Sequence, residues 1–233
     1  MLNSRKFSSK RLSLLCAVLT VGMSQNFFSI TAGEVNNRLV SRASGEAGVI
    51  GDAPSVAPDM TPDGRYLVFE SLSTNLVTGA AGRQVYLRDQ QTGDVELISK
   101  NTAGAAGNGS SYQAHVTADA RFVSFSSSST DLVSGDTNGF DDIFLRDRQA
   151  GTTVRISAPP GGGQTNGSSF QSRLSGDGRF VLFESRATNL ISGDTNQMGD
   201  GFLLDRTTGL IERVTLTSAV SYTHLTLPTN REV

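Results

Sequence analysis

Residues 174–185 of this chain read LSGDGRFVLFES. The same pattern occurs at residues 60–71 as MTPDGRYLVFES and at residues 116–127 as VTADARFVSFSS. The aspartates at the centre of the three copies are Asp63, Asp119 and Asp177, which are 56 and 58 residues apart. A repeat of this period predicts a solenoid or a propeller.

Each copy predicts four short strands. The first strand ends at the Asp-Gly pair, which is a hairpin signal because glycine accepts a positive φ. Ala120 replaces that glycine in the second copy, which predicts a cost of about 1 kcal/mol or a different turn. The second strand is nearly all apolar, as in a sheet covered on both faces. The third strands, at residues 85–87, 143–145 and 202–204, each precede an Asp and a Gly that predict another turn, and the fourth strands are expected at residues 95–98, 154–156 and 211–214.

The motif x-S/T-x-D-G-R-F/Y-V-x-F-E-S, followed by a strand, an Asp, a turn and a short strand, resembles the repeats of bacterial TolB-like β-propellers. These are WD-repeat-like units without the Trp-Asp pair, and the resemblance covers residues 55–215. It implies an all-β fold of about three four-stranded blades. Propellers have typically four to eight blades, so the ring is expected to be incomplete.

The repeats are expected at about residues 55–110, 111–168 and 169–219. Residues 25–54 form a lead-in with an orphan outer strand near residues 38–41, because Leu39-Val40-Ser41 matches the ends of the later fourth strands. Residues 1–24 are interpreted as a signal peptide, with a basic start and a twelve-residue apolar stretch at residues 12–23. An uncleaved anchor is the alternative, although a membrane span needs about 20 apolar residues.

Residues 220–229, VSYTHLTLPT, resemble an in-frame translation of a transposase-type sequencing adapter. Residues 220–233 are therefore interpreted as an artefact and excluded from the fold. Without residues 1–24 and 220–233, the 20 basic residues fall to 15 and the 22 acidic residues fall to 21, a net charge of −6. A mildly acidic body argues against nucleic acid as a partner, and no cysteine remains for disulfides or metal ligation.

A pattern of acidic and amide side chains recurs in the loop before the third strand. Asp136, Asn138 and Asp142 occupy the same repeat positions as Asp194, Asn196 and Asp200. Oxygen ligands at this spacing suit calcium, which takes 6–8 of them, so a weak calcium site is one hypothesis. The alternative is an Asx-turn that shapes the loop. No other metal or cofactor is expected.

The remaining carboxylates give no catalytic site. Asp63, Asp119 and Asp177 lie beside hairpin turns, so we expect them to cap those turns rather than act in catalysis. Glu70 and Glu184 end their second strands and are interpreted as solvated strand ends, although a catalytic pair across blades is the alternative. His115 has no identifiable Ser-His-Asp partners, and no G-x-S-x-G elbow occurs.

These patterns predict an exported, periplasmic or secreted β-propeller that binds a protein or glycan and has no membrane span in its mature chain. The TolB-like resemblance implies protein binding in the bacterial envelope. The alternative function is the propeller domain of a larger secreted hydrolase or lyase. Fold alone does not decide between them, because function depends on sites carried by the fold.

Overall fold

The computed structural model describes residues 39–45, 48–195 and 198–215. The predicted signal peptide, the first part of the lead-in and the predicted artefact at residues 220–233 lie outside the described residues. The described part contains strands and no helix. The strands are β1 (Ser55–Met60), β2 (Tyr66–Ser71), β3 (Gln84–Asp89), β4 (Val95–Leu97), β5 (Ser111–Val116), β6 (Phe122–Ser127), β7 (Asp142–Asp147), β8 (Thr152–Arg155), β9 (Ser169–Leu174), β10 (Phe180–Ser185), β11 (Asp200–Asp205) and β12 (Leu210–Arg213).

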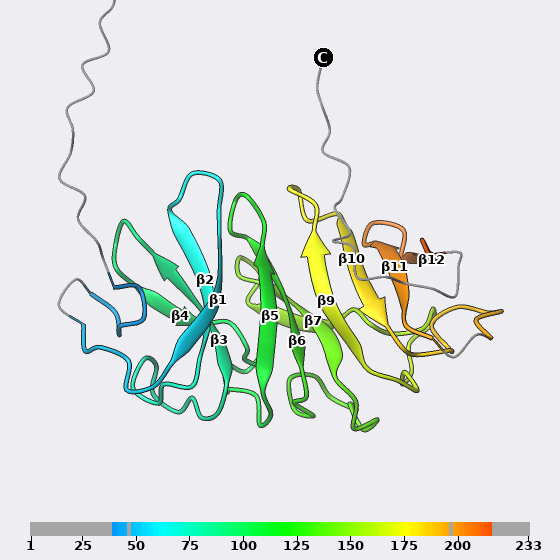
Figure 1. Cartoon of the computed structure of the whole chain (residues 1–233), viewed down its shortest axis with the longest axis horizontal. Coiled ribbons are helices and arrows are strands. Elements are labelled where there is room, and N and C mark those ends of the chain that lie inside the picture. Colours follow the sequence, from blue (N-terminus) through cyan, green and yellow to red (C-terminus); the bar gives the residue numbers. More distant parts are fainter. Residues whose placement is uncertain (1–38, 46–47, 196–197, 216–233) are drawn as a thin grey trace, which may run out of the picture. The chain divides into compact units, whose positions relative to one another are not determined.

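These strands form three antiparallel sheets of four strands, each in sequence order (Figure 1). Blade 1 is β1-β2-β3-β4, blade 2 is β5-β6-β7-β8, and blade 3 is β9-β10-β11-β12. The first strands β1, β5 and β9 lie side by side, and consecutive blades pack against each other. This is the arrangement of propeller blades, and the three blades form no closed ring, so both fold predictions are confirmed.

Every first strand contains a bulge. The pairing of β1 with β2 shifts between Val56 and Asp59, and β5 and β9 shift at the matching places. Within the three shifts lie Ala57, Gln113 and Gln171, with φ of 50°, 53° and 57°. Non-glycine residues rarely adopt this left-handed conformation, so its recurrence marks a built feature of the repeat.

The predicted capping of the first turn is confirmed. In blade 1, the Asp63 carboxylate accepts hydrogen bonds from the Thr61 hydroxyl at 2.5 Å and from the Arg65 amide at 3.0 Å. The same pairs recur in blades 2 and 3. Ala120 keeps the glycine-type turn with φ of 55°, and its amide donates to Thr117 at 2.8 Å. The substitution therefore leaves the turn type unchanged.

An arginine joins the two turns at this end of each blade. Arg65 donates to both carboxylate oxygens of Asp89, the residue that ends β3, with its closest contact at 2.9 Å. The Asp89 carboxylate also caps its own turn through the Gln91 amide at 2.8 Å. The hydrogen bond from Arg65 is the main cause that lowers the pKa of Asp89. Equivalent pairs join Arg121 to Asp147 and Arg179 to Asp205.

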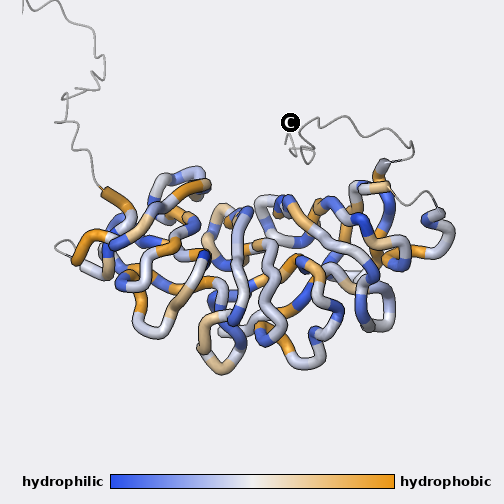
Figure 2. The backbone as a smooth tube through the Cα atoms, turned by 60° about the horizontal axis from the view of Figure 1, so that its bottom comes forward, coloured by the Kyte–Doolittle hydropathy of each residue, from blue (hydrophilic) through white to orange (hydrophobic). Residues whose placement is uncertain are grey.

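Two of the three hydrophobic clusters lie between neighbouring blades, and the third lies on blade 1. The rings of Phe125 and Phe144 in blade 2 stack with their centres 5.9 Å apart. They pack on Val68, Leu87 and Ile98 of blade 1. A matching cluster joins blades 2 and 3 around the pair Phe183 and Phe202. Hydrophobic stretches are accordingly spread over all three blades (Figure 2).

The orphan strand predicted at residues 38–41 is not formed by its described residues 39–41, because no strand of the described part pairs with them. Val40 instead packs on the cluster that contains Phe69 and Tyr86 of blade 1. It thereby takes the place that Ile98 holds between blades 1 and 2. The next residues follow the outer edge of β4, where Ser44 exchanges hydrogen bonds with Val95.

The two turn glycines Gly64 and Gly178 allow a matched test of the packing between blades 2 and 3. Both have φ close to +70°, but a Cβ on Gly178 would lie 2.6 Å from Cδ2 of Phe122, whereas a Cβ on Gly64 meets nothing within 4 Å. Gly64→Ala should cost about 1 kcal/mol of unfolding free energy for the backbone alone. Gly178→Ala should cost more because Phe122 must also move. Urea unfolding of both variants measures the difference, and equal losses would contradict the blade 2–blade 3 contact.

Candidate functional site

The predicted acidic set of blade 2 converges on an arginine. Asp142 begins β7, Asp136 lies in the preceding loop, and both are buried. Nη1 of Arg155, the last residue of β8, lies 3.1 Å from Oδ1 of Asp136 and 3.4 Å from Oδ2 of Asp142. The Arg155 side chain is itself only 10% exposed. The guanidinium therefore supplies the positive charge that two buried carboxylates need.

The Asp142 carboxylate is surrounded by further donors. It accepts hydrogen bonds from Asn138 Nδ2 at 2.9 Å, Ser157 Oγ at 2.6 Å and Thr165 Oγ1 at 3.1 Å. These donors come from the loop before β7 and from the segment that leads to β9. The cluster thus fixes two loops against the end of β8, as a buried polar network does when its members are paired.

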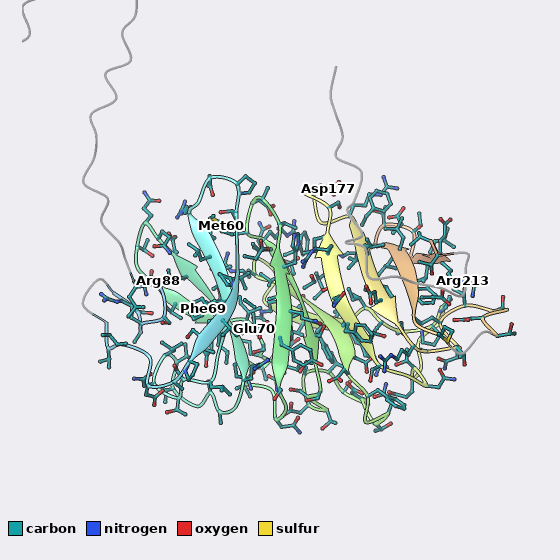
Figure 3. All side chains as sticks on the ribbon, viewed as in Figure 1. Met60, Phe69, Glu70, Arg88, Asp177 and Arg213 are labelled. Atoms are coloured by element: carbon teal, nitrogen blue, oxygen red, sulfur yellow. The ribbon has the colours of Figure 1, made fainter. Side chains whose placement is uncertain are left out.

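Blade 3 repeats the same geometry in its described part. Arg213 Nη1 lies 3.1 Å from Oδ1 of Asp194 and 3.5 Å from Oδ2 of Asp200 (Arg213 is labelled in Figure 3). Thr215 Oγ1 donates to Asp200 at 2.6 Å. Asn196, the third predicted ligand, lies outside the described residues.

Blade 1 shows that the carboxylate and the arginine occur together. Gln84 takes the position of Asp142, and Leu97 takes the position of Arg155. Gln84 is buried and carries no charge. Its amide donates to the carbonyls of Ala81, Gly107 and Gly109 and accepts from the Ser99 hydroxyl. Blade 1 therefore lacks both the carboxylate of Asp142 and the guanidinium of Arg155, which favours the ion pair as the role of these acids.

Burial is the main cause that raises the pKa of Asp136, and the neighbouring charge of Asp142 raises it further, while Arg155 lowers it. Among the described residues, no group of three or more His, Cys, Asp or Glu side chains is placed to hold a metal ion. Each loop offers two carboxylates that already contact a guanidinium. Calcium binding at Asp136, Asn138 and Asp142, and at the matching blade 3 positions, stays a prediction.

Arg155→Leu should destabilise the protein by about 3 kcal/mol because it leaves two buried carboxylates without their cation. The triple variant Asp136→Ala, Asp142→Gln, Arg155→Leu copies the blade 1 residues Ala80, Gln84 and Leu97 and should recover most of that loss. Urea unfolding at neutral pH measures both. A triple variant less stable than the single variant would argue against the ion pair.

Calcium separates the two roles of the same acids. On the ion-pair hypothesis, melting temperatures in millimolar calcium and in chelator should coincide for the unaltered protein, whose guanidinium neutralises the acids. Calcium should stabilise Arg155→Leu, where a cation can take its place, by mass action. A calcium-dependent shift of the unaltered protein that Asp142→Ala plus Asp200→Ala removes would support the metal site instead.

A second polar surface follows the first strands β1, β5 and β9. Asp59 of β1 accepts the Val116 amide of β5 at 3.2 Å, and His115 of β5 accepts the Leu174 amide of β9 through Nδ1 at 3.1 Å. These side chains occupy the same repeat position and bond the neighbouring strand. The row of first strands is therefore held by hydrogen bonds from blade to blade.

Glu70 belongs to this surface and is not the solvated strand end that the sequence suggested. It is 3% exposed, and its Oε1 accepts the amide of the bulge residue Gln113 at 2.6 Å (Figure 3). Arg83 lies 3.6 Å from its other oxygen. In blade 2, Ser126 takes this position, and Gln113 Oε1 accepts the amide of Gln171 instead, at 3.1 Å. Glu70 is thus a structural acceptor between blades.

No family model and no curated protein matches this chain. Solved structures do match. They include TolB from Acinetobacter baumannii, with 21% identity, a TM-score of 0.45 and coverage of 70% of this chain and 33% of that chain. A putative TolB from Agrobacterium tumefaciens gives 17% identity, a TM-score of 0.46 and coverage of 70% and 49%. The β-propeller domain of the Trilobed protease from Pyrococcus furiosus has 10% identity and a TM-score of 0.45, and the match covers 69% of this chain and 42% of that chain.

Two of these structures carry the name TolB, the family that the repeat motif resembles. The chain spans between a third and a half of the length of the TolB structures that it matches. The β-propeller assignment of this chain rests on its own blade geometry.

His115 is expected to make the contact between blades 2 and 3 sensitive to pH. Burial is the main cause that lowers the pKa of His115; Arg173 lowers it further, and Asp59, 3.8 Å from Nε2, raises it. The folded state therefore holds the neutral ring, whose Nδ1 accepts the Leu174 amide. Stability is then lost as pH falls from the unfolded pKa of about 6.5 toward the lower folded pKa.

His115→Gln keeps an acceptor for the Leu174 amide and cannot titrate. Between about pH 7 and pH 5 the unaltered protein should lose more stability than His115→Gln, as measured by urea unfolding at each pH. Equal losses in the two proteins would show that His115 does not carry this pH dependence.

Proposed function

We propose that the protein is an exported, non-enzymatic β-propeller module that binds a partner protein through the face of β1, β5 and β9. The observation that carries the proposal is the hydrogen-bonded row of first strands, which presents side chains on a fixed backbone. A surface held in this way loses little conformational entropy on binding.

The side chains on this face suit a protein partner. On β1, Val56 is 48% exposed and Met60 is 60% exposed. Arg173 on β9 is also exposed, and Tyr112 and Phe170 are half-buried beside the bulges. Methionine, arginine and aromatic residues are enriched in protein interfaces. Apolar and cationic groups together support a protein rather than a glycan as the partner.

The proposed export, to the periplasm or outside the cell, is supported by the signal peptide predicted at residues 1–24. Among residues 39–45, 48–195 and 198–215 there is no helix long and apolar enough to cross a bilayer. Binding of this kind requires no cofactor. A fusion of residues 1–60 to a reporter that is active only after export tests this part, and an inactive, cell-retained reporter would refute it.

The binding test compares face variants with a matched control. Met60→Glu and Arg173→Glu alter the first-strand face. The control Val154→Glu replaces an exposed valine of β8 with glutamate, the residue that blades 1 and 3 have at the same position, as Glu96 and Glu212. A partner cross-linked from a bacterial periplasmic extract should bind the two face variants about tenfold more weakly and the control equally well. A glycan array serves as the second arm. Glycan binding that the face variants lose, without any protein partner, would overturn the proposal.

A further inference from the structure

An open cavity of about 510 Å³ lies beside β4 on blade 1. It is lined by residues 77–79 of the loop after β2, by residues 95–97 of β4, and by Lys100 and residues 104–106 of the loop that leads to β5. Small-molecule sites have volumes of about 300–1,000 Å³ and combine apolar walls with a few polar groups. Because β1 forms the opposite edge of this sheet, the cavity is separate from the first-strand face.

Blade 2 fills the matching space with side chains. Leu97 of the cavity wall matches Arg155, and Ala106 matches Gln164, each 58 residues further along the chain. In blade 2, Arg155 Nη1 donates to Gln164 Oε1 at 2.8 Å, and Gln164 Nε2 donates to the Gly135 carbonyl. Leucine and alanine cannot make this bridge. The cavity of blade 1 is therefore the space that a guanidinium and an amide occupy in blade 2.

The floor of the cavity is apolar. Leu97 belongs to the hydrophobic cluster of blade 1, and Val77, Val95 and Ala106 pack against that cluster while staying partly exposed. Apolar surface that is open to water gains free energy when an apolar group covers it. The floor therefore favours a ligand with an apolar body.

The polar side of the cavity carries an excess of positive charge. Lys100 Nζ lies 3.2 Å from Oε1 of Glu96, and Arg148 Nε of blade 2 donates to Oε2 of the same carboxylate at 2.8 Å. Burial raises the pKa of Glu96, but the two cations outweigh burial and hold the pKa below its usual value. Two cations and one ionised carboxylate leave one positive charge.

Lys100 can present this charge to a ligand. Among the described residues, Glu96 is the one side chain that pairs with its ammonium group. An ammonium group has three N–H donors, so two of them are available at the cavity wall. A carboxylate is the group that such donors bind most strongly, through charge-assisted hydrogen bonds.

The wall of the cavity is fixed in the absence of a ligand. Asn101 Oδ1 accepts the Ala105 amide at 3.0 Å, and the Asn101 amide donates to the Ala105 carbonyl at 2.9 Å. The Lys100 carbonyl accepts the Thr153 hydroxyl of blade 2 at 2.5 Å. A wall held in this way loses little conformational entropy on binding.

We propose that this cavity binds a small monocarboxylate with an apolar body, whose carboxylate pairs with Lys100 and whose body covers Val77, Val95 and Leu97. A cationic ligand fits less well. Ala80 and Gln84 stand where blade 2 has the acids that hold its guanidinium, and Glu96 already has two cationic partners.

Two probes of the same shape test the charge of the ligand. Hydrocinnamate and hydrocinnamide share a phenyl ring and its chain, and they differ in a carboxylate against a neutral amide. In an amide NMR titration of the unaltered protein at neutral pH, hydrocinnamate should shift the signals of residues 77–79, 95–97 and 104–106. Hydrocinnamide should bind about tenfold more weakly. Equal affinities, or hydrocinnamate shifts that are absent or lie elsewhere, overturn the proposal.

Variants of Lys100 test the partner of the carboxylate. Lys100→Met removes the ammonium group and keeps an unbranched side chain, so it should weaken hydrocinnamate binding about tenfold and leave hydrocinnamide binding unchanged. The matched control Lys100→Arg keeps a cation and should keep most of the affinity. An unchanged affinity for hydrocinnamate in Lys100→Met would refute the pairing with Lys100.

Ala106→Gln tests the place of binding. By the geometry of blade 2, this glutamine should reach the carbonyl of Gly79, the counterpart of Gly135, and fill the cavity. Both probes should then fail to bind at concentrations that saturate the unaltered protein. Retained binding in the folded variant would place the ligand elsewhere. The Lys100 variants leave the floor intact, so they decide the proposal if Ala106→Gln does not fold.

Discussion

The packing of an aromatic pair on the aliphatic face of the preceding sheet is the interaction on which blades 2 and 3 depend. A four-stranded sheet whose central strands are apolar on both faces cannot keep both faces in water. Blade 2 resolves this by burying Phe125 and Phe144 against blade 1 and by offering Ile143, Leu145 and Ile156 to blade 3. The blades therefore share their stability with their neighbours, as expected for repeat proteins.

The sequence was sufficient for the features that recur within one unit. The constant spacing of Asp63, Asp119 and Asp177 predicted the repeat, and the residues around each aspartate predicted the strands and capped turns, because these depend on neighbours only a few residues away. It was not sufficient for the bulges. Gln113 and Gln171 adopt a positive φ without being glycines, at a cross-strand shift where their amides bond side chains of the preceding blade.

The acidic loops show why the site chemistry was harder to predict. Asp136 and Asp142 were selected by their spacing along one loop, but their cation is Arg155, which becomes a neighbour only through the register of β7 with β8. A signal was present in the sequence. An arginine stands thirteen residues after Asp142 and after Asp200, whereas a leucine stands thirteen residues after Gln84. Comparison of the units with each other reveals the pair that a search within one loop misses.

The bulges of the first strands bear on aggregation. Each first strand is an edge of its sheet, and a regular edge strand offers a row of unpaired amides and carbonyls to any extended chain. The bulges at Ala57, Gln113 and Gln171 interrupt that row and add twist. The acceptors Glu70 and Gln113 additionally occupy the amides of two of the bulges. Three parallel edges can therefore stand together on one face without serving as a template for fibrils.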